Sequence, residues 1–144
     1  MIKVGVIGAG GRMGRMLIQA VAQNPETKLA AAIERKGSSL VGVDAGELVN
    51  IDKADVALVD DLSQVVNDID VLIDFSLPES TVNNIKLCAE HGVNMVIGTT
   101  GLNDKQNAVF QEATKKIAIV YAGNYSTGVN LSLKLIEMAA KAFG

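Results

Sequence analysis

Cysteine, histidine, tryptophan and proline are all scarce in this sequence. Its 144 residues include one cysteine, Cys88, one histidine, His91, two prolines and no tryptophan. A lone cysteine excludes an intrachain disulfide, and one cysteine with one histidine cannot form a metal-ligand cluster, so we expect no metal site. Packing alone must hold the fold together. A chain of this length can do so, because it buries roughly two thirds of its unfolded surface.

Aromatic residues and basic runs are rare as well. Phe and Tyr make up 3% of the chain, and 13 basic residues against 16 acidic ones give a net charge of −3. With no basic block, nucleic acid is not an expected partner. No apolar run approaches the roughly 20 residues of a membrane span, and the N-terminus leads into a strand rather than a signal peptide. We therefore expect a cytoplasmic protein that makes no membrane contact.

Short β-branched runs alternate with helical patterns along the whole chain. We predict strands at residues 2–7, 29–33, 56–59, 71–75, 94–97 and 117–121, and helices at 12–23, 62–67, 78–91, 104–114 and 126–143. Residues 37–55 are glycine- and serine-rich near their start and are expected to form a long loop. Such alternation indicates right-handed βαβ units. The predicted fold class is α/β, a Rossmann-type, doubly wound and mainly parallel sheet of about six strands in the order 3-2-1-4-5-6.

Two of the predicted helices have informative faces. In the first, an apolar stripe of Met13, Leu17, Ala20 and Val21 lies opposite a polar stripe of Arg12, Arg15, Gln19 and Gln23. The last carries two apolar stripes and only a narrow polar edge. A helix this apolar needs cover on two sides, of which the sheet can supply one. We interpret Cys88 as a small apolar residue on the face of a helix. His91 is expected near the C-terminus of that helix, where a partial positive charge is favourable.

A glycine-rich turn follows the first strand and opens the first helix. Gly8, Gly11 and Gly14 satisfy G-x-x-G-x-x-G rather than the usual G-x-G-x-x-G, because Met13 stands where the last glycine would fall. Glycines let the backbone approach a pyrophosphate closely, and the helix N-terminus offers free N–H groups to the anion. The context favours dinucleotide binding over a purely structural turn.

An acidic and a basic residue end the second strand. Glu34 stands 20 residues after Gly14, where a carboxylate accepts hydrogen bonds from the adenosine ribose hydroxyls. Arg35 follows and could pair with a 2′-phosphate. The pair indicates tolerance of both NADH and NADPH. The alternative is a solvated strand end.

Small and hydroxyl-bearing residues follow the other strands on the same predicted edge of the sheet, where ligands of open α/β sheets bind. The fourth strand leads to Phe75 and Ser76, and the fifth to Gly98, Thr99, Thr100 and Gly101. The sixth leads to Ala122, Gly123, Asn124, Tyr125 and Ser126. Thr-Thr-Gly is equally an ordinary turn and helix-cap sequence.

Taken together, these segments resemble the dihydrodipicolinate reductases of lysine biosynthesis. The resemblance is carried by VGVIGAGGRMGRMLIQA, AAIERKGSSLVGVDAGEL, DFSLPEST, MVIGTTGLN and AGNYSTGVN, in the family's order across essentially all 144 residues. It implies reduction of a dihydropyridine dicarboxylate, or of its hydroxylated precursor after loss of water, with NADH or NADPH. The implied partner is therefore a small dicarboxylate substrate.

The resemblance also implies a role for each matching residue. Gly8, Ala9, Gly10, Gly11, Arg12 and Met13 would hold the pyrophosphate and the adjacent ribose. Glu34 would hold the adenosine ribose, and Arg35 the 2′-phosphate. Gly98, Thr99 and Thr100 would contact the nicotinamide end, with Thr100 also reaching the substrate, and Ala122, Gly123, Asn124 and Tyr125 would close over the nicotinamide. Gly123 departs from the family's usual Pro or Ala, which should loosen that loop slightly.

The family's catalytic His-His-x-x-x-Lys segment belongs to a second domain, which also forms a homotetramer interface. Residues 1–144 match the dinucleotide-binding domain only, so we expect no catalytic residue in this chain and no turnover by it alone. Two alternatives stay open from the residues. One is the cofactor domain of another dehydrogenase, such as homoserine or aspartate dehydrogenase, and the other is a self-standing NAD(H)-binding or redox-sensing module.

Overall fold

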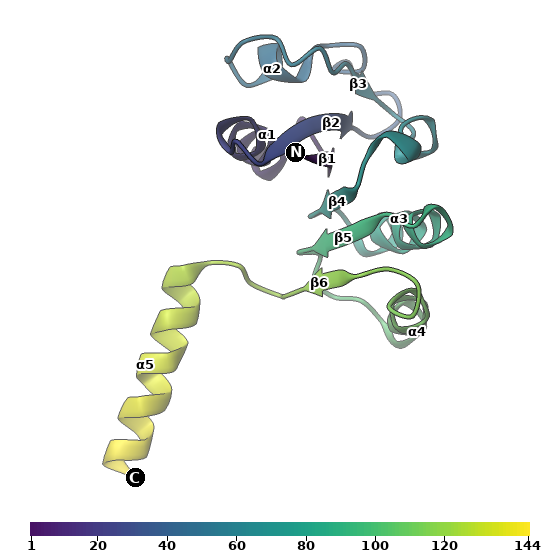
Figure 1. Ribbon diagram of the computed structural model, residues 1–144. Coiled ribbons are helices and arrows are strands. Elements are labelled where there is room, and N and C mark those ends of the chain that lie inside the picture. The colour runs from purple at the N-terminus through teal and green to yellow at the C-terminus, as the bar shows by residue number, and fades with distance from the viewer.

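Six strands form one sheet with helices on both of its faces, as the computed structural model of residues 1–144 shows (Figure 1). The strands are β1 (Ile2–Ile7), β2 (Thr27–Ile33), β3 (Leu58–Val59), β4 (Val71–Asp74), β5 (Asn94–Ile97) and β6 (Ile119–Tyr121). The helices are α1 (Arg12–Gln23), α2 (Ala45–Leu48), α3 (Pro78–His91), α4 (Asp104–Ala113) and α5 (Thr127–Phe143), with two 3₁₀ turns, η1 (Leu62–Gln64) and η2 (Val66–Asp68).

The sheet order is β3-β2-β1-β4-β5-β6, and every neighbouring pair is parallel. This confirms the predicted Rossmann-type order. The chain winds outward from β1 in one direction and then from β4 in the other. The switch between β1 and β4 leaves a crevice at the carboxyl edge, where sheets of this kind bind ligands.

Both faces of the sheet carry an apolar core. Within β1, Val4 and Val6 pack with Ile18 of α1, whereas Ile7 joins the core beneath α3, which includes Ile85. Successive strand residues point to opposite faces, so a run of apolar residues serves two cores at once. This explains why the strands read as continuous apolar runs rather than as alternating patterns.

The apolar stripe predicted for α1 was wrong in part. The residues that face the sheet are Gly14, Ile18 and Val21, while Met13 is 47% exposed. Since Gly14 has no side chain, the helix lies against the strand along the line through this glycine, which rotates Met13 outward. A stripe of apolar side chains does not identify this face, because the residue that decides the contact, Gly14, has no side chain.

The long loop predicted over residues 37–55 contains a short helix, α2. Its N-cap is Asp44, whose carboxylate accepts hydrogen bonds from four backbone N–H groups, those of Gly46, Glu47, Ala54 and Val56. These bonds, led by the one from Ala54, hold the pKa of Asp44 below its usual value. One carboxylate therefore organises twelve residues of connection, and glycine content alone did not reveal it.

Several predicted boundaries also move. Strand β2 begins earlier than predicted, whereas β3 and β6 begin later, and the helix predicted at 62–67 is the pair of turns η1 and η2. In contrast, α3 ends as expected, at Gly92 with φ of +73°. His91 lies in its last turn, and its Nδ1 is 2.8 Å from Oδ1 of Asn67.

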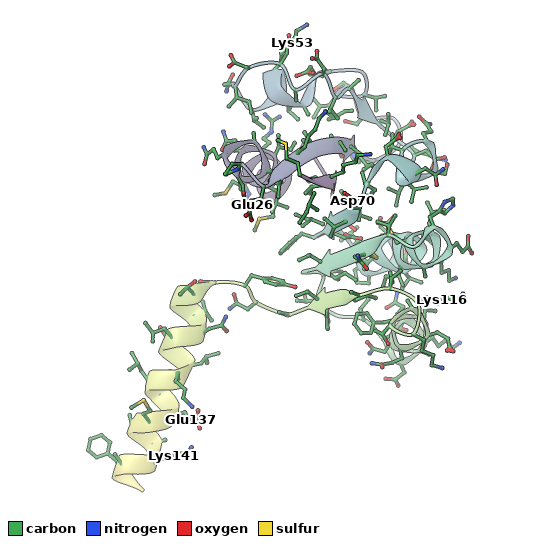
Figure 2. All side chains as sticks on the ribbon, viewed as in Figure 1. Glu26, Lys53, Asp70, Lys116, Glu137 and Lys141 are labelled. Carbon is green, nitrogen blue, oxygen red and sulfur yellow. The ribbon has the colours of Figure 1, made fainter.

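Helix α5 projects away from the rest of the molecule, with its side chains radiating from the ribbon around the labelled Glu137 and Lys141 (Figures 1 and 2). None of its residues is buried. The expectation that the sheet covers one of its apolar faces was wrong, because the segment after β6 carries the helix away from the sheet. Its exposed apolar residues include Leu131, Leu133, Leu135, Ile136 and Met138. None of the helices, α5 included, has the length and apolarity that crossing a bilayer demands.

Cys88 provides a test of the core beneath α3. Its side chain is fully buried, and burial, together with the charge of Asp74, raises the pKa of the thiol to about 12. The native chain should therefore resist a thiol reagent across pH 7 to 9, whereas the urea-unfolded chain should react once per molecule, because its thiol ionises near pH 8.5.

The same shift predicts the sign of a stability change. The folded thiol keeps its proton after the unfolded one has lost it, so the free energy of unfolding should fall as the pH rises above about 9. The variant Cys88→Ala should lack this component of the pH dependence. Rapid labelling of the native chain at pH 7 would contradict the burial.

Candidate functional site: a glycine turn at the carboxyl edge

The turn from β1 into α1 presents unpaired backbone N–H groups at the carboxyl edge. Gly8 adopts a φ of +70°, which suits glycine, and the amide of Gly11 donates to the carbonyl of Gly8 over 2.9 Å. No side chain caps the helix. The amides of Arg12, Met13 and Gly14 consequently have no hydrogen-bond acceptor in the structure. A helix N-terminus with free amides is an anion site by geometry and by dipole.

Gly14 lets the turn lie flat against the strand end. A Cβ atom built on this residue would collide with the carbonyl of Gly8 and approach Cα of Ala9 to 2.8 Å. These neighbours are backbone atoms, which cannot rotate away. The lack of a side chain at Gly14 therefore allows α1 to pack closely against the end of β1. A pyrophosphate needs such a cradle, so the residues present fit a dinucleotide.

Arg15 braces the turn from the side. Its Nε donates to the carbonyl of Gly10 over 3.0 Å, and its Nη1 donates to the carbonyl of Leu48 over 2.6 Å. The interpretation of Arg15 as part of a polar stripe missed this role, because Leu48 lies 33 residues away in the sequence. Arg12, by contrast, is exposed beside the turn.

The carboxylate of Glu34 lies over the same turn. One oxygen accepts from the amide of Gly10 over 2.7 Å, and the other accepts from the amide of Arg35 over 3.0 Å. Two backbone donors thus fix the side chain toward the glycine turn, rather than leaving it solvated at a strand end. The guanidinium of Arg35 makes no hydrogen bond or ion pair and stays available to a ligand. Ala9 faces the core and bonds its amide to Ile33.

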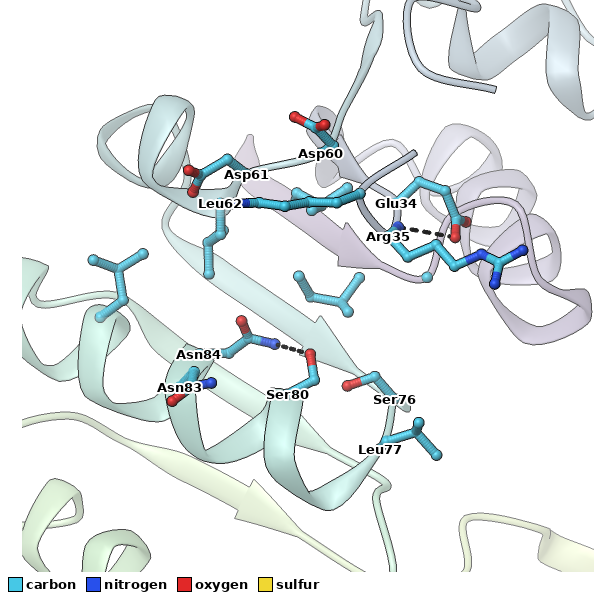
Figure 3. Close-up of a pocket in the computed structure, with 15 residues that line it drawn as sticks. Glu34, Arg35, Asp60, Asp61, Leu62, Ser76, Leu77, Ser80, Asn83 and Asn84 are labelled. Atoms are coloured by element: carbon cyan, nitrogen blue, oxygen red, sulfur yellow. Dashed lines mark hydrogen bonds between the residues drawn. The ribbon is translucent and has the colours of Figure 1, made fainter. Parts of the chain in front are cut away.

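Two hollows flank the glycine turn and share Ile7 and Gly8 in their walls. The first, of about 540 Å³, reaches from Glu34 and Arg35 across to Ser76 and the start of α3 (Figure 3). The second, of about 600 Å³, runs along Gly11 to Gly14 and reaches Phe75. One elongated ligand that crosses the free amides could occupy both. A dinucleotide has this layout, with a central pyrophosphate between two nucleoside ends.

Further along the carboxyl edge, Phe75 lines the second hollow and belongs to an aromatic pair with Tyr125. The ring of Phe75 packs directly on Gly98, where a Cβ atom would collide with it. The ring of Tyr125 lies 5.6 Å from that of Phe75, and its hydroxyl donates to the carbonyl of Ile97 over 2.9 Å. Burial raises the pKa of Tyr125. The segment after β6 is thereby tied to the end of β5.

The remaining strand-end residues divide into exposed and buried. Thr100 is exposed, and a Cβ on Gly123 would meet only its Cγ2 atom, at 3.9 Å, so these two segments are neighbours. Asn124 is also exposed and uses Oδ1 to accept from the amide of Ser126 over 2.7 Å, while Ala122 bonds its amide to Ile97. Thr99 differs, since only 3% of it is exposed.

A buried polar cluster beneath this edge escaped the sequence interpretation. Asp74, at the end of β4, is fully buried and accepts from the amide and the hydroxyl of Ser76 and from Nδ2 of Asn84. Thr81 and Thr99, both buried, share a hydrogen bond of 2.7 Å. The only signal in the sequence was an acidic residue ending an otherwise apolar strand. One partner, Asn84, lies on a different element, α3.

The strand order, the glycine turn and the flanking hollows define a dinucleotide-binding Rossmann domain of the oxidoreductase type. Comparison with known proteins makes this assignment specific. Residues 2–125 match the family model described as "Dihydrodipicolinate reductase, N-terminus". The chain belongs to the dihydrodipicolinate reductase family, as its N-terminal, NAD(P)H-binding domain. Family membership favours this family over the homoserine and aspartate dehydrogenases considered from the sequence.

Close relatives agree. The chain is 68% identical over its full length to a 4-hydroxy-tetrahydrodipicolinate reductase of Psychrobacter arcticus, of which it covers 52%. It is 56% identical over 142 residues to the enzyme of the same name from Acinetobacter baumannii, again covering 52% of that protein. The chain thus spans about half the length of the curated relatives it matches.

Solved structures support the same fold. A dipicolinate-bound dihydrodipicolinate reductase from Paenisporosarcina sp. TG-14 superposes with a TM-score of 0.72 at 27% identity, over 97% of this chain and 54% of that one. An amine dehydrogenase from Mycobacterium smegmatis, at 24% identity and a TM-score of 0.60 over 78% of this chain and 37% of that one, shares the fold alone.

The anion site can be tested at Gly11. Its φ of −73° is open to any residue, and a Cβ there would lie 3.2 Å from the carbonyl of Gly8. Gly11→Val should fold but obstruct a phosphate, lowering affinity for NADH and NADPH alike by more than about tenfold, or roughly 1.4 kcal/mol. Titration by fluorescence would measure this. Gly11→Ala serves as the milder step of the series, and unchanged affinity in a folded Gly11→Val chain would remove the turn from the site.

Proposed function

We propose that this chain is the cofactor-binding half of a 4-hydroxy-tetrahydrodipicolinate reductase and holds NADH or NADPH across its carboxyl edge. The observation that carries the proposal is the row of free amides at Arg12, Met13 and Gly14, set between two hollows. Glu34 and Arg35, which suit a ribose and a 2′-phosphate, stand at one end of that arrangement.

The arrangement suggests an orientation for the dinucleotide. The pyrophosphate would lie on the α1 N-terminus, beside Gly8 to Met13. The adenosine ribose would lie in the hollow beside Glu34 (Figure 3). The nicotinamide end would then lie toward Phe75 and the segments that follow β5 and β6. Gly98, Thr99, Thr100 and Ala122 to Tyr125 belong to those segments, in agreement with the roles that the resemblance implies.

The chemistry divides between the cofactor and the protein. The bound dinucleotide supplies a hydride, and the residues of this chain orient its ring and exclude water from one side. Thr100, exposed at the edge, is the residue we propose for substrate contact. A neutral hydroxyl is a very weak acid at pH 7, so neither Thr99 nor Thr100 can serve as a proton donor, and the exposed Thr100 can only orient a substrate. We assign no catalytic residue within 1–144.

The proton donor and most of the substrate site would then belong to a second domain. The family match ends at Tyr125, while α5 starts two residues later and is exposed on every side. We propose that its apolar faces pack within that second domain, which would also build a homotetramer. The dipicolinate bound to the Paenisporosarcina reductase is a small aromatic dicarboxylate, which supports a dicarboxylate as the substrate class.

Cofactor choice gives one test of this orientation. Arg35→Ala removes a cation with no partner of its own, so NADPH affinity should fall roughly tenfold while NADH affinity barely changes. Glu34→Ala removes the ribose acceptor and should mainly weaken NADH. The measurement is the dissociation constant of each cofactor with each variant. Equal losses of both cofactors in both variants would contradict the orientation.

The proposed absence of a proton donor from this chain gives a second test. The 144-residue chain should bind NADH saturably, yet oxidise none above background when the dihydropyridine dicarboxylate is added. General acid catalysis is typically worth 10²- to 10⁴-fold, and lost substrate positioning can cost several kcal/mol more. A full-length relative assayed in parallel controls for substrate quality. Robust turnover by the contaminant-free chain would place the acid within these residues and overturn the proposal.

A further inference from the structure

Residues 99–101, which connect β5 to the segment before α4, are held by very little. The amide of Gly98 still donates to the carbonyl of Asp74 over 2.9 Å, the last bond of the sheet pattern. Beyond it, the backbone groups of Thr99, Thr100 and Gly101 make no hydrogen bond, and Gly101 adopts a φ of +82°. The sole hydrogen bond of these three residues is the one between the hydroxyls of Thr81 and Thr99, at 2.7 Å.

Thr81 is itself connected to the buried cluster beneath the edge. Its Oγ1 lies 3.4 Å from Oγ of Ser76, and that hydroxyl donates to the carboxylate of Asp74 over 2.6 Å. Asn84, one turn further along α3, donates to the other oxygen of the same carboxylate over 2.8 Å. A series of side-chain hydrogen bonds therefore leads from the end of β4, through the first turns of α3, to the segment after β5.

Burial stabilises this series of side-chain hydrogen bonds. Asp74 and Thr81 are fully buried and Thr99 nearly so, and no buried side-chain polar atom in the molecule lacks a partner. Hydrogen bonds in a dry interior are stronger than exposed ones, and an unpaired hydroxyl there is costly. The Thr81–Thr99 pair thus has two effects. It removes both hydroxyls from solvent, and it ties the segment carrying Thr100 to helix α3.

We propose that Thr81 is a positioning residue for the nicotinamide half of the cofactor, acting through Thr99 on the Gly98–Gly101 segment. The inference rests on the proposed function, which places the nicotinamide at this segment. Thr81 lines neither hollow beside the glycine turn, and its hydroxyl points to Thr99 rather than into the crevice. Thr99 contributes in the same way, so its hydroxyl serves the segment and not the ligand directly.

The position of this pair predicts a selective defect. The adenosine and pyrophosphate subsites depend on Glu34 and on the α1 N-terminus, which make no hydrogen bond with the Thr81–Thr99 pair. Loosening residues 99–101 should therefore weaken a ligand that has a nicotinamide ring and spare one that lacks it. ADP-ribose is such a ligand, since it keeps the adenosine, the pyrophosphate and the second ribose.

The experiment compares NADH with ADP-ribose on the 144-residue chain. Thr81→Val keeps the shape of the side chain and removes the hydroxyl. It should lower NADH affinity about threefold to tenfold, the effect of one hydrogen bond, while ADP-ribose affinity changes by less than about twofold. The fluorescence of bound NADH, which comes from the reduced ring, should fall in parallel. Thr81→Ser, which retains a hydroxyl, should restore both readouts.

Two further variants keep the test decisive. Thr27→Val is the matched control, because it removes a hydrogen-bonded threonine hydroxyl at the opposite edge of the sheet, and it should leave both ligands unaffected. If Thr81→Val does not fold, Thr99→Val breaks the same bond from the other side and should show the same selectivity.

The outcomes separate the two proposals. If the wild-type chain binds both ligands, equal losses of NADH and ADP-ribose, or no loss of either, would overturn the role of Thr81 alone. If the wild-type chain binds neither ligand, the proposed function fails, and this inference fails with it. A selective loss of NADH that Thr81→Ser restores supports both.

Discussion

The close approach of α1 to the end of β1 is the contact on which the rest of the site depends. It is possible only because position 14 has no Cβ, since the neighbouring atoms are the backbone of Gly8 and Ala9. Once the helix starts this close to the strand, its first three amides face the crevice between β1 and β4. At this point the chain stops adding strands on one side of the sheet and begins adding them on the other. The same rotation moves Met13 outward, beside the second hollow. One missing side chain thus sets the helix position, the anion site and the exposed flank.

The position of the turn would have little effect if the turn could flex, and three interactions prevent this. Arg15 bonds the carbonyl of Gly10 to α2, Glu34 accepts from the amide of Gly10, and Gly11 closes back on Gly8. Gly10 is consequently fixed through both its N–H and its C=O. A preorganised turn loses less entropy when a ligand binds, which is an economical use of a loop whose glycines would otherwise be highly mobile. Asp44 contributes indirectly, because its carboxylate fixes the segment around α2 to which Arg15 is hydrogen-bonded.

The features that could be predicted from sequence are those written in local patterns. Apolar runs predicted the six strands, their alternation with helices predicted the strand order, and the strand–glycine–helix context predicted the turn. The features that escaped are pairings between distant residues. Arg15 meets Leu48 across 33 positions, and Thr81 meets Thr99 across 18. Periodicity describes which face a residue occupies, but not which element lies opposite that face. For the same reason, the two apolar stripes of α5 predicted a need for cover without identifying its source.

The two ends of the crevice differ in the same way, because one is held by local backbone hydrogen bonds and the other by contacts between distant side chains. At the adenosine end, the groups that would meet a ligand are backbone amides and a carboxylate held by backbone amides, so they are fixed by secondary structure itself. At the proposed nicotinamide end, the strands have already ended, and the segments are held instead by side-chain contacts: Phe75 on Gly98, Tyr125 on Ile97 and Thr81 on Thr99. A hydride moves only when the reacting atoms are held within a narrow range of distance and angle. In the proposed orientation, the end of the site that has to meet this demand depends on buried side-chain contacts. A substitution of a residue that lines neither hollow, such as Thr81, would then affect hydride transfer without touching the ligand.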